Sequence, residues 1–517
     1  MNLVEQVRQR ALEQPNRIAF HYKGKDITYG EFEQAVGQFA SVIRHLNIQK
    51  GEHIALLLGN RPEFLISLYA AMRAGVTVIP INPIYTMDEI TYIVNNGDVK
   101  AIIAEESFLK TIEKGIHAFP QVESYLICES SNKIEEKVSI LSESVKEKVK
   151  LFNKELDSIT TLFDCVEIDH EDTAVILYTS GTTGYPKGAM LSHKNLYSNA
   201  RDVSNHFLMS SEDRVIATLP LFHVFGLTVV ANAPLLKGAN ILIAPRFSPS
   251  EIYELAETQK ATVFAGVPTM LNFLCQFKKG NPENFSYLRL AISGGAPLPI
   301  SVLHSFEERF NIKVSEGYGL SEAAPVTCFN PLNRERKPGS IGMSIPNVEN
   351  RVVDDQGNEV PIGEVGELVV RGPNVMKGYY KLPEETSNAI REGWLYTGDL
   401  ARKDEDDYFY IVDRKKDLII VGGYNVYPRE VEEVLYSHPN VLESAVVGIP
   451  DPDFGETVYA YVTLKENTST ICELQQFCAK SLAKYKIPEV IEFIDRIPKN
   501  STGKILKREL KEMEKTN

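Results

Sequence analysis

The stretch AVILYTSGTTGYPKGAM, residues 174–190, joins a short apolar run to a loop rich in glycine, serine and threonine. A short apolar run that ends in turn residues is typical of a buried β-strand. The loop offers backbone N–H groups at its glycines, the hydroxyl groups of Ser180, Thr182 and Thr183, and the ammonium group of Lys187. Because these groups all attract negative charge, the stretch predicts a strand that carries an anion-binding loop suited to a polyphosphate.

The loop differs from two common phosphate-binding motifs. A Walker A loop has glycine before its lysine and serine or threonine after it, whereas Lys187 lies between Pro186 and Gly188. The glycines at 181, 184 and 188 also do not fit the G-x-G-x-x-G spacing of a Rossmann fingerprint. The loop is therefore either a third kind of phosphate loop or, judged by itself, a surface turn.

Strand and helix patterns alternate on both sides of this loop. Upstream, the apolar runs at residues 53–58, 76–81 and 99–104 are separated by helical patterns. From residue 174 onward come five further apolar runs, AVILY, RVIAT, NILIA, TVFAG and LRLAIS. Such alternation predicts βαβ units in a largely parallel sheet, and therefore an α/β fold.

The pattern changes twice in the second half of the chain. From about residue 336, short strands punctuated by glycine and proline predict a small antiparallel sheet or barrel. At residues 410–428, charged residues and a Gly-Gly turn lead into a helix that begins near Pro428. The strands SAVVGIP and VYAYVTL and a helix over residues 471–483 complete a compact α+β unit of roughly 100 residues, the size of an autonomous domain.

Composition excludes several classes of function. The chain has 517 residues, with 55 Lys and Arg against 69 Asp and Glu, and its net charge of -14 argues against binding to nucleic acid or broad adsorption to anionic membranes. The six cysteines have no metal-ligand spacing and suggest reduced thiols. The first residues lack the apolar core of a signal peptide, and no uninterrupted apolar run is long enough for a transmembrane helix, so a cytoplasmic protein is expected.

Six segments together carry a family resemblance. In chain order they are YTSGTTGYPKG, SGGAP (293–297), EGYGLSE (316–322), WLYTGD (394–399), IVDRKKDLIIVGGYNVYP (411–428) and PKNSTGKILKREL (498–510). They resemble the adenylate-forming superfamily of acyl-CoA synthetases, luciferase and the adenylation domains of peptide synthetases. The resemblance covers nearly the whole chain and is greatest to bacterial long-chain fatty acid–CoA ligases.

The resemblance implies a nucleotide site and a metal site. The phosphate loop contributes Thr179, Ser180, Gly181, Thr182, Thr183, Gly184 and Lys187. The adenine and ribose side contributes Gly295, Ala296, Pro297, Glu316, Gly317, Tyr318, Gly319, Asp399 and Arg414, with Tyr318 stacked on the base and Asp399 accepting the ribose hydroxyls. Ser321 would reach the α-phosphate, and Glu322 would hold Mg²⁺, a cation that prefers carboxylate and phosphate oxygens.

The resemblance also implies the catalytic groups, which are Lys504, Thr179, Glu322 and His223. Lys504 would lie between the substrate carboxylate and the α-phosphate, where negative charge accumulates. Taken singly, without the resemblance, these residues have more common interpretations: Lys504 as a solvated surface lysine, Tyr318 as a core aromatic residue and Asp399 as a turn residue.

Two further segments predict which residues bind the acyl group and which face coenzyme A. PLFHVFGLTVV, residues 220–230, has no acidic residue to pair with an α-ammonium group, which favours an apolar acyl substrate. The predicted acyl pocket consists of His223, Val224, Gly266, Gly294 and Gly295. His223 either orients the carboxylate or is a core histidine. On the coenzyme A side the resemblance implies Gly422, Gly423 and Tyr424, and it places a hinge at Lys416.

The sequence thus predicts a large N-terminal α/β domain (1–413) with a small antiparallel β subdomain, a hinge (414–417) and a small mobile α+β C-terminal domain (418–517). The predicted function is an ATP-dependent, AMP-forming ligase that converts a fatty acid, expected to be long-chain, to acyl-adenylate and then to acyl-CoA, with ATP, Mg²⁺ and coenzyme A. Transfer to a carrier-protein thiol and a non-catalytic binding protein of the same fold are the alternatives. The predicted partners are these small molecules and no nucleic acid; peripheral membrane contact and oligomeric state stay open.

Overall fold

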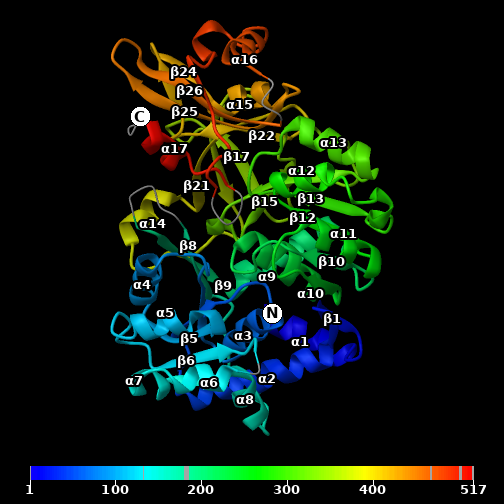
Figure 1. Cartoon of the computed structure of the whole chain (residues 1–517), viewed down its shortest axis with the longest axis vertical. Coiled ribbons are helices and arrows are strands. Elements are labelled where there is room, and N and C mark those ends of the chain that lie inside the picture. Colours follow the sequence, from blue (N-terminus) through cyan, green and yellow to red (C-terminus); the bar gives the residue numbers. More distant parts are fainter. Residues whose placement is uncertain (1, 132, 180–184, 466–468, 500–503, 515–517) are drawn as a thin grey trace.

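A computed structural model of the chain describes residues 2–131, 133–179, 185–465, 469–499 and 504–514. Within these residues the strands form four sheets, of eight, nine, five and five strands. The first two sheets and the first five-stranded sheet belong to the N-terminal part, and the last sheet lies at the C-terminal end of the molecule (Figure 1). The predicted α/β fold with a smaller C-terminal unit is confirmed.

The eight-stranded sheet carries the phosphate loop. Its order is β19-β9-β8-β4-β3-β5-β6-β7, and the pairs from β8 to β7 are parallel. Its strands are β3 (His53–Leu57), β4 (Thr77–Pro80), β5 (Val99–Glu105), β6 (Ser124–Cys128), β7 (Val149–Leu151), β8 (Thr173–Thr179), β9 (Lys187–Ser192) and β19 (Gly378–Tyr379). β8 and β9 pair antiparallel with Thr179 opposite Lys187, so the loop joins the two strands of a hairpin.

Helices cover the strands of this sheet in the predicted alternation. Thr28 caps α2 (Tyr29–His45) and Thr86 caps α4 (Met87–Asn96), each through a capping box with the glutamate three residues on. Pro62 begins α3 (Pro62–Arg73), whose side chains are almost all buried. The other helices of this region are α1 (Leu3–Glu13), α5 (Leu109–Gly115), α6 (Ile134–Ser139), α7 (Glu143–Lys146) and α8 (Phe152–Ser158).

The nine-stranded sheet provides the second half of the framework. Its order is β16-β15-β14-β13-β12-β10-β11-β1-β2, with parallel pairing from β14 to β1. Its strands are β1 (Ile18–Tyr22), β2 (Lys25–Thr28), β10 (Arg214–Ala217), β11 (Asn240–Ile243), β12 (Val263–Gly266), β13 (Leu290–Ser293), β14 (Val314–Gly319), β15 (Val326–Phe329) and β16 (Met343–Ser344). The helices around it are α9 (His193–His206), α10 (Ala233–Lys237), α11 (Pro249–Thr258), α12 (Pro268–Gln276) and α13 (Ile300–Phe310).

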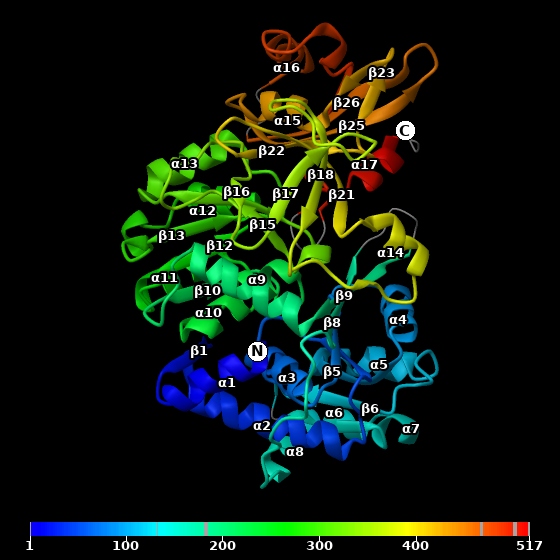
Figure 2. The ribbon, with the colours of Figure 1, turned by 180° about the vertical axis from the view of Figure 1, so that it is seen from behind.

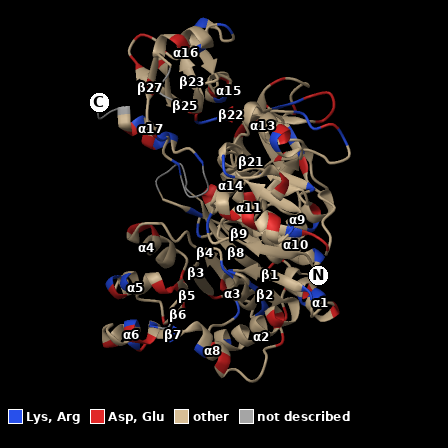
Figure 3. Cartoon of the chain, turned by 45° about the vertical axis from the view of Figure 1, so that its right-hand side comes forward, with Lys and Arg blue, Asp and Glu red and all other residues tan. Residues whose placement is uncertain are grey.

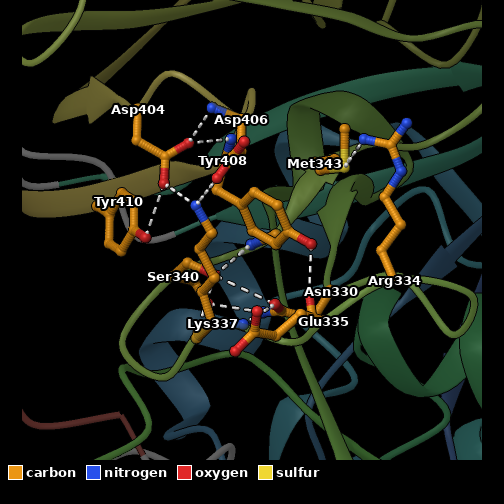
Figure 4. A network of polar contacts seen from close by, with 11 residues as sticks. Asn330, Arg334, Glu335, Lys337, Ser340, Met343, Asp404, Asp406, Tyr408 and Tyr410 are labelled. Atoms are coloured by element: carbon orange, nitrogen blue, oxygen red, sulfur yellow. Dashed lines mark hydrogen bonds and ion pairs between the residues drawn. The ribbon is translucent and has the colours of Figure 1, made fainter.

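The predicted antiparallel unit after residue 336 is also present. It consists of β17 (Glu349–Val353), β18 (Gly366–Arg371), β20 (Ile390–Arg391), β21 (Trp394–Lys403) and β22 (Phe409–Arg414), with α14 (Pro383–Ala389) beside it. Lys337 ties the preceding segment to the β21–β22 hairpin through ion pairs with Asp404 and Asp406, and lies over the Tyr408 ring (Figure 4). This network fixes the hairpin whose two strands carry Asp399 and Arg414.

The C-terminal unit packs α15 and α16 on its own sheet. Its elements are β23 (Ile419–Val421), β24 (Tyr424–Val426), α15 (Pro428–Tyr436), β25 (Val441–Asp451), β26 (Gly455–Leu464), α16 (Ile471–Cys478), β27 (Val490–Phe493) and α17 (Lys507–Glu514). α16 ends five residues before the predicted Ala483. The chain turns there, with Leu482 N–H donating to the Cys478 carbonyl oxygen, because the turn buries Leu482 in the core of this unit.

Two surface properties agree with the composition. Acidic and basic residues occur together on α5, α6 and α13 rather than in patches of one sign (Figure 3). In the described part of the chain, none of the helices combines the length and the apolarity that a membrane crossing requires.

Candidate active site

Segments far apart in the sequence meet beyond the carboxyl ends of β13 and β14. Thr179 in the first sheet donates a hydrogen bond of 3.5 Å to Glu322, and the Tyr318 hydroxyl donates to Asp399 on β21. Lys504 interacts electrostatically with Asp399 and with His223. Ligands of open α/β sheets bind at this end of parallel strands. The structure therefore brings Thr179 to Glu322, and it brings Tyr318, Asp399, Lys504 and His223 together.

The predicted residues lie on short segments around this point. Gly266 ends β12, and His223 and Val224 precede a buried π-helix, Gly226–Asn232. The loop after β13 carries Gly294, Gly295, Ala296 and Pro297; β14 carries Glu316, Gly317, Tyr318 and Gly319; and a 3₁₀ turn carries Ser321 and Glu322. Ser180, Gly181, Thr182, Thr183 and Gly184 lie outside the described residues.

Asp399 is the centre of the predicted ribose side. It is 8% exposed and accepts from the Tyr318 hydroxyl, while the Arg414 Nε atom lies 3.3 Å from Asp399 Oδ1. Arg414 is held there because β21 and β22 pair with Asp399 opposite Arg414. Burial and the Asp399 carboxylate raise the pKa of Tyr318 well above its usual value, so the hydroxyl stays a donor.

Lys504 lies in a cluster with an excess of positive charge. Burial and the Arg414 guanidinium, followed by Lys416, lower the pKa of Lys504 to about 8, while Asp399 and Asp417 act in the opposite direction. Burial and Arg414 also lower the pKa of Lys416. Three cations that destabilise one another gain from a bound anion, so this cluster suits phosphate and carboxylate groups.

His223 is a neutral imidazole in this environment. Burial and the charge of Lys504 lower its pKa to about 4. Its Nδ1 atom accepts from the Phe225 backbone N–H at 3.3 Å, so the proton of the neutral ring is on Nε2. The side chain can therefore orient an acceptor but is a poor proton donor at neutral pH.

Glu322 is suited to one position in a magnesium site. Its Oε1 atom accepts from the Tyr379 hydroxyl at 2.9 Å and from Thr179 at 3.5 Å. Among the described residues there is no cluster of three His, Cys, Asp or Glu side chains that would hold a metal alone. Mg²⁺ commonly takes one or two carboxylates and completes its shell with substrate phosphates and water. Glu322 therefore fits a metal that arrives with a phosphate ligand.

Lys187 has partners that the sequence did not indicate. Its ammonium forms an ion pair with Glu385 on α14 and lies 5.5 Å from the centre of the Tyr379 ring. Tyr379 is placed by pairing with Ala189, two residues after Lys187, and by a hydrogen bond from its N–H to Thr386. Tyr379 thus links the phosphate-loop lysine to Glu322. Neither Tyr379 nor Glu385 lies in a motif used above.

The structure gives a reason for glycine at two of the predicted positions, Gly295 and Gly294. Gly295 has φ +79°, a conformation that side chains disfavour. At Gly294 a Cβ would lie 3.2 Å from Phe225 Cζ. That small residues at 294 and 295 leave space for an acyl chain stays a prediction. Phe225 is thus a neighbour of the predicted acyl pocket that the sequence reasoning missed, although it lies two residues after His223.

The predicted coenzyme A residues lie elsewhere. Gly422 and Gly423, with φ of +56° and +86°, form the turn of the β23–β24 hairpin, which by itself explains both glycines. Tyr424 is exposed and stacks on Tyr485 at 5.0 Å. In both views the hairpin lies on the side of the C-terminal unit away from β8 and β9 (Figures 1 and 2). The hairpin and the strands β8 and β9 therefore lie apart in this arrangement.

Comparison with known proteins shows which family models and relatives this chain matches. The model of the AMP-binding enzyme family matches residues 7–380, and that of the AMP-binding enzyme C-terminal domain matches residues 430–504. The chain is 38% identical to a long-chain-fatty-acid–CoA ligase of Bacillus subtilis (strain 168), over 97% of this chain and 93% of the relative. It is 33% identical to a feruloyl-CoA synthase of an Amycolatopsis species, over 97% of both.

Solved structures add information on the arrangement of the two parts. ATP-bound MatB from Rhodopseudomonas palustris is 33% identical, with 100% of this chain and 99% of MatB covered and a TM-score of 0.88. For apo MatB, at the same identity and coverage, the TM-score is 0.79. The present arrangement is therefore more similar to the ATP-bound form of MatB than to its apo form.

Proposed function

The chain belongs to the AMP-binding enzyme family, and on this premise we propose that it is an ATP-dependent, AMP-forming ligase that converts fatty acids to acyl-CoA. The observation that carries the proposal is the meeting of Lys504, Asp399 and His223, which come from three distant segments. A charged lysine beside a ribose acceptor and a neutral histidine is suited to joining a carboxylate to a nucleotide. ATP, Mg²⁺ and coenzyme A are the co-substrates and cofactor of this reaction.

The reaction has two steps that balance without a protein nucleophile. In the first, a carboxylate oxygen of the acid bonds to the α-phosphorus of ATP, the α–β phosphoanhydride bond breaks, and pyrophosphate leaves. In the second, the thiol of coenzyme A attacks the acyl carbon, the acyl–phosphate bond breaks, and AMP leaves with the bonding electrons. The thiol proton passes to AMP or solvent.

The residues divide the first step among them. Lys504 stabilises the charge that builds up between the carboxylate and the α-phosphate. Asp399, with Arg414 beside it, accepts the ribose hydroxyls, and Tyr318 lies next to the base. The neutral His223 orients the carboxylate. Glu322, held by Tyr379, would hold the magnesium ion, and that ion would supply positive charge to the phosphates.

The C-terminal unit serves the second step in a different pose. Tyr424 and Tyr485 form an exposed aromatic surface beside Gly422 and Gly423. Phe454, also exposed, lies between β25 and β26, and its carbonyl oxygen accepts from the Gly422 N–H at 2.8 Å. We propose that the C-terminal unit rotates about a hinge near Lys416. The rotation moves Lys504 away from the active site and brings this aromatic surface to it, so that coenzyme A reaches the acyl-adenylate. The proposed parts are residues 1–413, the hinge 414–417 and residues 418–517.

A panel of acids tests this function. We expect AMP formation with coenzyme A present to be most efficient for long-chain fatty acids and weak for acetate, because the segment at His223 is apolar and the relatives include long-chain-fatty-acid–CoA ligases. Ferulate is the informative competitor, since one relative is a feruloyl-CoA synthase. If kcat/KM were highest with ferulate, the proposed substrate would change from a fatty acid to an aromatic acid. If no acid gave AMP, the proposed ligase function would be refuted.

Glu385→Gln is expected to lower the KM for ATP and the inhibition constant of pyrophosphate by about fivefold. Glu385 neutralises Lys187 and would lie near the incoming phosphates, and one such charge interaction close to water is worth about 1 kcal/mol. Initial rates at varied ATP and pyrophosphate measure both constants. Glu384→Gln is the control, because it makes the same charge change one residue away. A higher KM in Glu385→Gln would mean that the ion pair assists ATP binding.

A cytoplasmic location is proposed on two grounds. All six cysteines are free thiols in the structure, as a reducing compartment would keep them. The substrates ATP and coenzyme A are available inside the cell.

A further inference from the structure

A second lysine of the C-terminal tail reaches the N-terminal part. Lys499 precedes the segment that carries Lys504 and forms an isolated β-bridge with Ile505. Its side chain is 12% exposed, and its ammonium donates to Thr269 Oγ1 at 3.2 Å and forms an ion pair with Glu443. Thr269 lies on α12 and Glu443 on β25, so the two partners belong to different parts of the molecule.

We propose that Lys499 is a positioning residue that fixes Lys504 for acyl-adenylate formation by docking the tail against Thr269. The proposal rests on the ligase function argued above. Because Lys499 and Ile505 are bridged, a displacement of Lys499 displaces the base of the segment that carries Lys504. The bond to Thr269 thus sets the position of the catalytic ammonium relative to the N-terminal site.

The Lys499–Thr269 contact lies next to residues assigned to the nucleotide site. Lys499 and Thr269 line a small cavity between the two parts, together with Ala296 and Pro297. Those two residues belong to the loop assigned to the adenine. One wall of the cavity therefore includes the loop assigned to the adenine, and the other includes Lys499 and Ile505, the two bridged residues on either side of Lys504.

Glu443 has a separate role from Thr269. It is buried to the same extent as Lys499 and neutralises its ammonium within the C-terminal unit. The ion pair can therefore persist when this unit rotates, whereas the bond to Thr269 requires the adenylating pose. Removing the Thr269 hydroxyl breaks the contact between the parts and leaves the ion pair in place.

The test compares the two half-reactions in single turnovers. Thr269→Val keeps the shape of the side chain but removes the acceptor, and we expect acyl-adenylate formation to fall about ten- to a hundredfold, the scale of one hydrogen bond to a charged group. Thioester formation from supplied acyl-adenylate should change by less than twofold. Thr269→Ser keeps the hydroxyl and should retain the wild-type rate of the first step.

Lys499→Met is the second variant. It should slow the first step at least as much as Thr269→Val, and the double variant should be no slower than Lys499→Met alone, because both remove the same contact. Lys465→Met, which removes a lysine bonded to the Pro439 carbonyl within the C-terminal unit, is the control and should leave both steps unchanged.

Two results would overturn the inference. Equal slowing of both half-reactions in Thr269→Val would show a general structural effect, and additive effects in the double variant would show that Lys499 and Thr269 act independently. Both outcomes require an active wild-type enzyme. If the wild type itself released no pyrophosphate with ATP and any acid, the proposed function would fail instead.

Discussion

Lys504→Ala is expected to slow acyl-adenylate formation by about two to three decades, the scale of removing one preorganised electrostatic donor from an active site. The ammonium interacts electrostatically with Arg414, Asp399 and Lys416, and Asp399 is 8% exposed, so water screens the charge at Asp399 only partly. Alanine removes the charge of Lys504, which we assign to the first step and not to the second. Thioester formation from supplied acyl-adenylate should therefore continue, which single-turnover kinetics of each half-reaction will measure.

The pH dependence provides a control on this assignment. Protonated Lys504 is the form that stabilises negative charge, and burial lowers its pKa to about 8. Adenylation by the wild type should therefore fall as the pH rises through about 8, because the amine loses its proton. This decrease should be absent from the residual rate of Lys504→Ala. Equal loss of both half-reactions, or an unchanged pH profile, would contradict the role given to Lys504.

Asp399→Ala is expected to lower kcat/KM for ATP by about one to two decades, because hydrogen bonds to a charged group contribute about 1.5–3 kcal/mol each. The substitution removes the ribose acceptor and leaves the buried Tyr318 hydroxyl and Arg414 without their partner. The KM for the acid should change much less. Initial rates with ATP and acid varied separately measure the difference.

Tyr318→Phe is the control for this variant. It removes the hydroxyl that Asp399 accepts from but keeps the ring and the carboxylate, so the loss should be smaller than in Asp399→Ala. If Asp399→Ala changed only the KM for the acid, Asp399 would not be a ribose ligand, and the arrangement of the site given above would be wrong.

The sequence predicted the framework because its signals are local. The apolar strands before Gly59 and Ile81, the helical patterns between the strands, and the switch to short strands after residue 336 each depend on neighbours in the chain. The resemblance then indicated Asp399, Lys504 and Tyr318, which the structure brings together. Their roles, and the division of the chain at the hinge, stay predictions that the variants above will test.

The missed residues have long-range partners and no pattern of their own. Tyr379 and Glu385 reach Lys187 from about 190 positions later in the chain, and Lys499 reaches Thr269 across 230. Phe225 is one apolar residue among many in its segment. The glycines at 422 and 423 were predicted both as a turn and as coenzyme A residues; the structure has the turn, between β23 and β24, and the coenzyme A role stays a prediction.

The pairing of β19 with β9 has a consequence for synthesis on the ribosome. β9 ends at Ser192, and the strand that covers its edge begins at Gly378, so this edge is complete only after the chain between them has been made. At about 5–20 residues per second, that interval lasts about ten to forty seconds. β1 likewise waits for β11, more than 200 residues later. An unpaired edge next to apolar strands invites aggregation, so the nascent chain should depend on chaperones until α14 has emerged.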